Sequence, residues 1–336
     1  MRSIVDAPPR KVVIGTMIYA MWEPYPGLES RLNALVGFID RMVAEAKMKY
    51  NAGLDLAILP ECAVTGEPGQ QGLISFPLEG KVLEIMGAAA RRNRTYLIVP
   101  LTLEEDRERG IYTNSNVLLD RDGEEAGNYR KVHLAGLMGE DKLEGGLMPG
   151  KGFPVFDCDF GKLGIQVCFD MAFDDGWEAL ARKGAEIVAW PSQWPSTVEP
   201  RCRAHKYHYY IVSSTWRNNA SIFDPTGNII AQTAEPSSIL VEQVDLTYAL
   251  IDWQPKLKNG KAFDERYSEA VGYRYRESED RGIFWSNDPK IPIMQMVREL
   301  GLESWAEEAA RSRKVQDRLR GGPALGAATR QTGRPG

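Results

Sequence analysis

Short apolar runs alternate along the chain with longer segments in which apolar residues recur every three or four positions. The runs are rich in aliphatic and β-branched residues and end at turn-forming residues, which is typical of buried β-strands. The longer segments predict helices, because their spacing gathers the apolar side chains on one face. The pattern predicts strands over 12–20, 54–60, 96–103, 161–168, 186–192, 210–215 and 239–246, and helices over 30–50, 81–93, 177–184 and 198–209.

Tight turns add antiparallel strands to this pattern. The runs at 111–120 and 127–134 flank the turn sequence RDGEE, and a second hairpin is predicted around DPTG at 224–227. Strands that alternate with helices favour an α/β fold whose sheet is covered by helices, and the hairpins argue against a plain doubly wound sheet. At the start of the first helix, Ser30 is the predicted N-cap.

The absence of linker-type sequence sets the expected domain boundaries. No Pro-, Gly- or Ser-rich linker interrupts residues 10–246, so we expect one folded core there. Residues 247–300 are rich in Trp, Tyr, Arg and Asp, and we interpret them as an ordered segment that wraps this core within one domain of residues 1–300. Residues 301–336 then comprise a helix over 302–320 and a flexible tail.

The composition narrows the classes of partner. The 336 residues are 43% hydrophobic and 26% charged, and the net charge of -5 gives no reason to expect nucleic acid or an anionic membrane as partner. No apolar run approaches the about 20 residues that span a bilayer, and the N-terminal sequence lacks the apolar stretch of a secretory signal, so we expect a cytoplasmic protein. Four cysteines without a CxxC pair, and three histidines, predict neither a disulfide framework nor a zinc site.

Cys168 is the first candidate for chemistry. It ends the apolar run 161–168, and the polar and bulky segment 169–177 follows at once. A strand would fix the position of the thiol while the next backbone N–H groups stay free to meet a developing negative charge. Because a free thiol has a pKa of about 8.5, a nucleophile here needs a nearby base or a positive field.

Two charged residues could supply them. Glu61 closes the apolar strand that begins at Leu54, and a partly desolvated carboxylate suits general acid–base work. Lys131 lies in strand-like sequence, where a rigidly held ammonium could stabilise a thiolate and an oxyanion. Each residue alone is more often structural: a buried Cys usually packs, a Glu at a strand end usually caps, and a Lys in a hairpin is usually solvated.

The sequences around the three residues resemble those of the nitrilase superfamily of carbon–nitrogen hydrolases. LPECAVTG (59–66) is similar to the family's glutamate motif, YRKVHL (129–134) to its lysine motif and GKLGIQVCFD (161–170) to its cysteine motif, in the family's order. The resemblance covers roughly residues 10–246. It implies a four-layer α-β-β-α sandwich that pairs its sheets across a dimer interface, and hence a homodimer or a higher homo-oligomer.

The resemblance also implies a role for each residue. Glu61 would be the general base, Lys131 the cation that stabilises the oxyanion, and Cys168 the nucleophile, with the backbone N–H of Phe169 as a second oxyanion donor. The family carries a second glutamate before a PG turn, which favours Glu144. Glu140, farther from that turn, is the alternative for this position. The substrate would be a small molecule, and the reaction would need no metal or organic cofactor.

Two other interpretations compete with that of a carbon–nitrogen hydrolase. A papain-like hydrolase would pair Cys168 with His133, His205 or His208, but papain-like cysteines usually begin a helix near the N-terminus. A non-catalytic binding protein of the same fold is the second reading. The presence of all three residues argues against it.

The residues near the cysteine bear on the substrate. Nitrile-cleaving relatives usually follow the cysteine with Trp-Glu, so Phe169-Asp170 favours an amide or N-carbamoyl (ureido) substrate over a nitrile, which stays the alternative. Carbamoyl-amino-acid relatives often place arginines shortly after the cysteine, where this chain has Met171 and Ala172. A carboxylate grip is therefore missing or comes from Arg201, Arg203 or Arg217. The candidates for lining the pocket are Trp190, Trp194, Tyr112, Asn114, Asn116 and His133.

Overall fold

The structure is a computed structural model that describes residues 7–67, 73–136, 142–234 and 237–321. The chain divides into two compact units, of which the larger comprises Arg10–Leu246 and the smaller the remaining described residues. Across these ranges, every helix is too short or too polar to cross a membrane.

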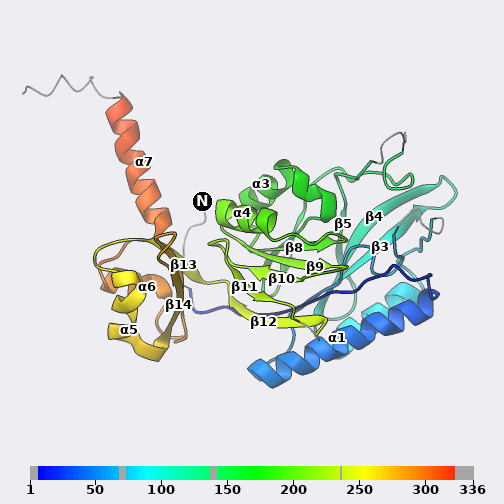
Figure 1. Ribbon diagram of the computed structural model, residues 1–336, viewed down its shortest axis with the longest axis horizontal. Coiled ribbons are helices and arrows are strands. Elements are labelled where there is room, and N and C mark those ends of the chain that lie inside the picture. The colour runs from blue at the N-terminus through cyan, green and yellow to red at the C-terminus, as the bar shows by residue number, and fades with distance from the viewer. Residues whose placement is uncertain (1–6, 68–72, 137–141, 235–236, 322–336) are drawn as a thin grey trace, which may run out of the picture. The chain divides into compact units, whose positions relative to one another are not determined.

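Two mixed sheets of six strands form the larger unit (Figure 1). The first sheet has the order β12-β1-β2-β3-β4-β5, in which β1, β2 and β3 run parallel and the other neighbours antiparallel. Its strands are β1 (Lys11–Met17), β2 (Leu56–Ile58), β3 (Tyr96–Asp106), β4 (Ile111–Leu119), β5 (Glu125–Arg130) and β12 (Ile239–Asp245).

The second sheet has the order β11-β10-β9-β8-β7-β6, with β7, β8 and β9 parallel. Its strands are β6 (Val155–Cys158), β7 (Gly161–Ile165), β8 (Ile187–Ser192), β9 (Tyr210–Thr215), β10 (Ser221–Phe223) and β11 (Ile229–Gln232). The inner faces of the two sheets touch: Thr16 Oγ1 donates to the carbonyl oxygen of Ser213 at 2.6 Å, and Ser214 Oγ to that of Met17 at 3.0 Å.

Helices cover the two outer faces. Over the first sheet lie α1 (Leu28–Tyr50), the π-helical turn η1 (Leu83–Gly87) and α2 (Ala88–Asn93); over the second lie α3 (Asp175–Arg182) and α4 (Val198–Tyr207). Leu35 and Ile39 of α1 pack with Leu97 of β3, and Trp177 of α3 packs with Val188 of β8. Figure 1 shows α1 on one side of the strands and α3 with α4 on the other. The predicted α-β-β-α sandwich is confirmed.

Several predicted boundaries are wrong. The first helix begins at Leu28, two residues before Ser30, and Gly27 stands at its N-cap without a side-chain hydrogen bond. Strand β7 ends at Ile165, three residues before Cys168, and β5 ends at Arg130, so Lys131 follows a strand rather than lying within one. Beyond the end of β5, the backbone N–H of His133 binds the carboxylate of Asp170 at 2.9 Å.

The smaller unit has its own sheet and core. Its strands have the order β13-β15-β14, and Phe263, Phe284 and Met296 lie in one buried cluster. Its elements are β13 (Tyr248–Asp252), η3 (Lys258–Gly260), α5 (Lys261–Tyr267), η4 (Ser268–Ala270), β14 (Val271–Arg276), β15 (Arg281–Ser286), α6 (Ile293–Glu299) and α7 (Trp305–Gly321). Only α7 was predicted. That residues 247–300 wrap the core stays a prediction, and the predicted tail from 322 onward lies outside the described residues.

Candidate active site

The three candidate residues lie just beyond strand ends. Glu61 follows β2 by three residues, Lys131 follows β5 directly, and Cys168 follows β7 by three. The backbone N–H of Lys131 still donates to the carbonyl oxygen of Asn114 in β4 at 2.8 Å, which fixes the lysine at the end of the β4–β5 hairpin. The strands of the two sheets thus fix the positions of the short segments that carry the three side chains.

A closed network of charges surrounds Lys131. Its ammonium donates to Glu61 Oε1 at 2.8 Å and to Glu144 Oε1 at 2.5 Å, and its side chain is only 1% exposed. Asn114 Nδ2 joins the same two carboxylates, at 2.9 Å to Glu61 and 3.1 Å to Glu144. The structure therefore brings together the two predicted glutamates, the lysine and one predicted pocket residue. Glu140 lies outside the described residues.

The network keeps Lys131 charged. Burial alone would lower its pKa, but the negative groups around it, Glu61 foremost, outweigh burial and raise the pKa well above its ordinary value. A cation that is buried, charged and held by two carboxylates can stabilise negative charge without reorganising.

Glu61 is itself fixed at several points. Besides Lys131 and Asn114 at Oε1, its Oε2 accepts the backbone N–H of Gln193 at 3.1 Å, and its carbonyl oxygen accepts the indole N–H of Trp216 at 2.8 Å. The residue is 2% exposed. A carboxylate held in this way keeps one orientation toward the thiol.

The thiol of Cys168 is neutral at rest. Burial, the nearby negative charge of Glu61 and a hydrogen bond with that carboxylate raise the pKa of Cys168 to about 12, although Lys131 and a hydrogen bond with Ser192 oppose the rise. A neutral thiol cannot attack effectively until a base removes its proton, and Glu61 is the base whose charge acts on this thiol. The geometry therefore suits general-base activation rather than a preformed thiolate.

The backbone around Cys168 forms a tight elbow. Cys168 has a φ of 42°, in the left-handed region, and opens the one-turn 3-10 helix η2 (Cys168–Ala172). Because Phe169 lies in the first turn of η2, its backbone N–H has no carbonyl partner within that turn. This leaves it available at the position predicted for an oxyanion donor.

The predicted pocket residues occupy different places. Trp190 is buried, and its indole N–H donates to the carbonyl oxygen of Cys168 at 3.2 Å, so it helps to fix the backbone at the elbow. Trp194 is 65% exposed, and Tyr112 in β4 is half-buried with its carbonyl oxygen bound by Met148 N–H. Asn116 is fully buried in the same strand as Asn114.

The side chains of His133 and His205 have partners other than the thiol. His133 Nδ1 lies 2.9 Å from Asp170 and Nε2 lies 3.4 Å from Asp175, and its ring stacks on Phe173 at 4.0 Å between centroids. His205 Nδ1 lies 3.2 Å from the carbonyl oxygen of Thr226. His208 is the C-cap residue of α4. The papain-like pairing therefore gains no support, since the base that acts on the pKa of Cys168 is Glu61.

Two of the three candidate arginines are engaged elsewhere. Arg201 donates to the carbonyl oxygen of Gly227 at 2.9 Å, and Arg203 pairs with Asp174. Arg217 is exposed, and its guanidinium lies 5.9 Å from the ring centroid of Trp194.

Four neighbours of the reacting groups were not predicted from the sequence: Ser192, Gln193, Trp216 and Asp170. A signal for the first three exists, because β7, β8 and β9 are parallel and their carboxyl ends lie together, so residues that follow them meet at one edge. Within the ranges the structure covers, no cluster of three or more His, Cys, Asp or Glu side chains could hold a metal ion.

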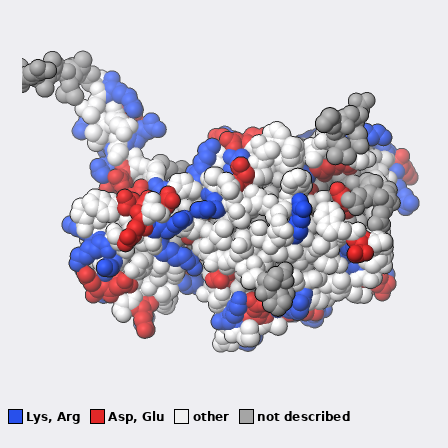
Figure 2. All heavy atoms as spheres, viewed as in Figure 1, with Lys and Arg blue, Asp and Glu red and all other residues white. Residues whose placement is uncertain are grey.

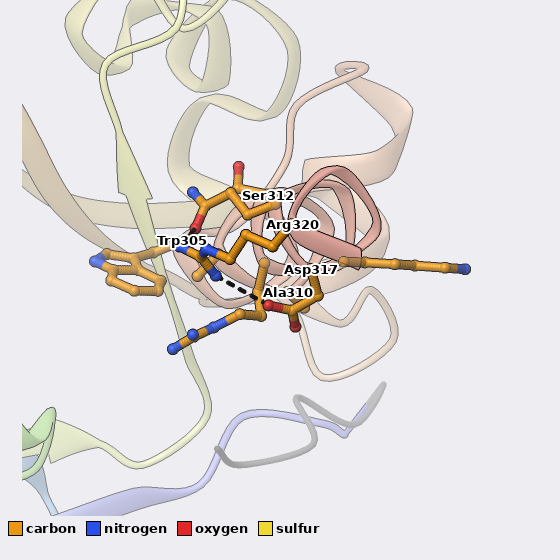
Figure 3. Close-up of a pocket in the computed structure, with 9 residues that line it drawn as sticks. Trp305, Ala310, Ser312, Asp317 and Arg320 are labelled. Atoms are coloured by element: carbon orange, nitrogen blue, oxygen red, sulfur yellow. Dashed lines mark hydrogen bonds and ion pairs between the residues drawn. The ribbon is translucent and has the colours of Figure 1, made fainter. Parts of the chain in front are cut away.

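A separate groove lies along α7 in the smaller unit (Figure 3). Trp305, Ala310 and Ser312 line it, and Asp317, also on its wall, pairs with Arg320 at 3.0 Å. Figure 2 shows charges of both signs over the visible face and basic side chains along α7. The groove offers neither a thiol nor an imidazole, so it is no competitor as the reactive site.

Comparison with known proteins connects this geometry to a family. A family profile described as Carbon-nitrogen hydrolase matches residues 25–250. The human Deaminated glutathione amidase is 31% identical over 229 residues, which are 58% of this chain and 68% of the relative. The Omega-amidase NIT2-B of Xenopus laevis is 26% identical over 235 residues, which are 62% of this chain and 82% of the relative.

Solved structures share the fold. Nit3 of Saccharomyces cerevisiae, described as a member of branch 10 of the nitrilase superfamily, aligns with a TM-score of 0.57 at 22% identity, over 70% of this chain and 90% of that one. A carbon-nitrogen hydrolase from Helicobacter pylori G27 aligns with a TM-score of 0.59 at 19% identity and the same coverage.

Proposed function

The chain belongs to the carbon–nitrogen hydrolase family, and from that premise we propose that it hydrolyses the C–N bond of a small amide or N-carbamoyl compound through a thioester on Cys168. The observation that carries the proposal is a partly buried thiol whose pKa is raised by the carboxylate of Glu61, which in turn binds a buried ammonium. Nucleophile, base and cation are the three parts that acyl transfer requires.

In the acylation step, Glu61 takes the proton of the Cys168 thiol while Sγ attacks the carbonyl carbon. The tetrahedral oxyanion is stabilised by Lys131 Nζ and by the backbone N–H of Phe169. Glu61 then gives its proton to the leaving nitrogen, the C–N bond breaks, and ammonia or an amine departs to leave a thioester. Glu144 and Asn114 hold Lys131 and Glu61 in place through this step.

In the deacylation step, Glu61 takes a proton from water as the water oxygen attacks the thioester carbonyl carbon. The same two donors stabilise the second oxyanion. The C–S bond breaks, the sulfur regains the proton from Glu61, and the carboxylic acid leaves. Every group returns to its starting protonation state, so no cofactor enters the balance.

An amide or ureido substrate is favoured over a nitrile. Phe169 and Asp170 follow the nucleophile where nitrile-cleaving relatives usually have Trp and Glu. Two of the relatives are named for amidase activity, which supports the same branch. Nitrile hydrolysis remains the alternative outcome of the test.

We expect the purified protein to release ammonia from one or more primary amides or N-carbamoyl amines, and to be unaffected by EDTA because the proposed steps use only Glu61, Lys131 and Cys168. The measurement is ammonia release across a panel of amides, N-carbamoyl amines, N-carbamoyl amino acids and nitriles. Turnover of nitriles far faster than of their amides would overturn the amide assignment. No turnover of any C–N substrate would overturn the proposed function.

Arg217 is the residue best placed to recognise a carboxylate at the far end of the substrate. It follows Trp216, whose indole binds the carbonyl oxygen of Glu61, and it faces the ring of Trp194. Trp194 in turn follows Gln193, whose N–H binds the Glu61 carboxylate. Trp194 and Arg217 are both exposed, and each directly follows a residue that is hydrogen-bonded to Glu61. A guanidinium that stacks on an aromatic ring still has N–H donors to offer a carboxylate.

We predict that Arg217→Met raises the KM for an amide with a terminal carboxylate by about 10-fold or more, the scale of one charge-assisted hydrogen bond. The KM for the neutral amide of the same chain length should stay within about twofold, because that substrate offers no anion to bind. Steady-state kinetics with the matched pair of substrates measures the difference. Equal changes for both substrates would remove Arg217 from this role.

A further inference from the structure

Asp170, two residues after the nucleophile, has a fully buried carboxylate on which four hydrogen-bonding groups converge. Its Oδ2 accepts the backbone N–H of Val167 at 2.8 Å and the phenolic O–H of Tyr129 at 2.7 Å. Its Oδ1 accepts the backbone N–H of His133 at 2.9 Å and lies 2.9 Å from the Nδ1 of the same residue.

These contacts join the two segments that carry the reacting groups. Val167 immediately precedes Cys168, while Tyr129 and His133 lie two residues on either side of Lys131. The segments come from different sheets, since β5 ends the first sheet and β7 belongs to the second. A single carboxylate thus fastens the cysteine elbow to the lysine segment.

The elbow needs such an anchor. A non-glycine residue with a φ of 42° is strained, and this conformation persists only where the surroundings determine it. Asp170 is the third residue of η2, and its side chain reaches back to the N–H of Val167 in the manner of a capping box. Its backbone is held too, because the indole N–H of Trp177 donates to its carbonyl oxygen at 3.0 Å.

We propose that Asp170 is a positioning residue that sets the separation of the Cys168 thiol and the Lys131 ammonium. This inference rests on the proposed function only in taking the Cys168 thiol as the nucleophile. A misplacement of about 1 Å in such a site can cost about 10²-fold in rate. Asp170 therefore contributes to the reaction without touching the reacting atoms.

An amide cannot replace this carboxylate. The two backbone N–H groups, of Val167 and His133, cannot reorient, and each faces a different oxygen of Asp170. In Asp170→Asn one of them must face the amide NH₂, whichever way the side chain is flipped. One of the two attachments is then lost while the volume stays the same.

We predict that Asp170→Asn lowers kcat by at least about tenfold while KM stays within about threefold, because geometry at the reacting centre suffers more than binding does. The rate at which chloroacetamide alkylates Cys168, followed by mass spectrometry of its peptide, should fall in parallel. Asp175→Asn is the matched control, since it removes the carboxylate 3.4 Å from the other nitrogen of His133, and both rates should stay within about twofold. Unchanged kcat and alkylation in Asp170→Asn would overturn the proposal.

A second comparison separates positioning from damage to the fold. If Asp170 acts through the cysteine–lysine geometry, its replacement should slow alkylation much less in a Lys131→Met background than in the wild type. The same slowing in both backgrounds would mean a general structural effect and would overturn the proposal. Should Asp170→Asn lack a cooperative unfolding transition, Tyr129→Phe removes one donor only and should slow alkylation by about threefold; an unchanged rate would count against Asp170. Alkylation needs no substrate, so a failure to find an amide substrate would defeat the proposed function without deciding this inference.

Discussion

Replacing Cys168 by Ala should abolish turnover while the melting temperature stays within a few degrees of the wild type. The replacement removes the nucleophile. Ala at a φ of 42° is about as strained as Cys, so the backbone strain at this position is unchanged. The flanking contacts, including the bond from Trp190 to the carbonyl oxygen of residue 168, involve backbone atoms that remain. Ammonia release and thermal unfolding measure the two quantities.

The same prediction has a positive form. Wild-type protein quenched during turnover should carry one acyl group on Cys168, which intact-mass and peptide mass spectrometry detect. Cys202 offers a control, because it is exposed on α4 and Cys202→Ala should leave the rate unchanged. An adduct mapped to Cys62, Cys158 or Cys202 would refute the assignment of the nucleophile.

The pKa of the thiol adds a dependence on pH. Because burial and Glu61 raise the pKa of Cys168 to about 12, the free enzyme holds a neutral thiol at pH 7. Alkylation of Cys168 by chloroacetamide should therefore accelerate by about tenfold per pH unit from pH 7 to pH 10, as the thiolate fraction rises. A rate that stays constant from pH 7 to pH 10 would contradict alkylation through a thiolate of raised pKa.

The layered fold could be predicted because its elements are regular in sequence. The helix at α1 repeats apolar residues at helical spacing over six turns, and β1, β8 and β9 each contain a short apolar run and are almost fully buried. The three-stranded sheet of the smaller unit could not be predicted from the sequence. In β14, Tyr alternates with Arg, a pattern typical of exposed sequence, although Tyr273 packs against the buried cluster. The homo-oligomer implied by the resemblance stays a prediction.

The site was only partly predictable for a different reason. Glu61 and Cys168 follow regular apolar strands, so each could be placed at a strand end, whereas Lys131 was expected within a strand and follows one. Asp170 could not be assigned its contacts, because they join residues 129 and 133 to residue 167 across two sheets. Contacts between sheets depend on how the layers stack, and the periodicity of apolar residues along the sequence gives no information about that stacking.

The second large effect concerns the charged pair, and we predict that Glu61→Gln and Lys131→Met each lower kcat by at least about 10²-fold. Gln keeps the shape of Glu61 but cannot take the thiol proton, and Met keeps the length of Lys131 but cannot stabilise the oxyanion. Single-turnover kinetics with the quenched adduct should show slower acylation in both variants. A rate near that of the wild type in either variant would remove that residue from the mechanism.

The two variants should differ in stability, which tests the charge network separately from catalysis. Glu61→Gln leaves Lys131 paired with Glu144 at 2.5 Å, so the remaining charges still balance. Lys131→Met instead leaves the buried carboxylate of Glu61 and the partly buried one of Glu144 without the cation they shared, and breaking a buried pair in this way costs about 3–5 kcal/mol. Adding Glu144→Gln to Lys131→Met should restore part of the lost unfolding free energy without restoring activity, because the surplus charge is removed while the oxyanion partner is still missing. Equal stability losses in Glu61→Gln and Lys131→Met, measured by urea unfolding, would contradict the network.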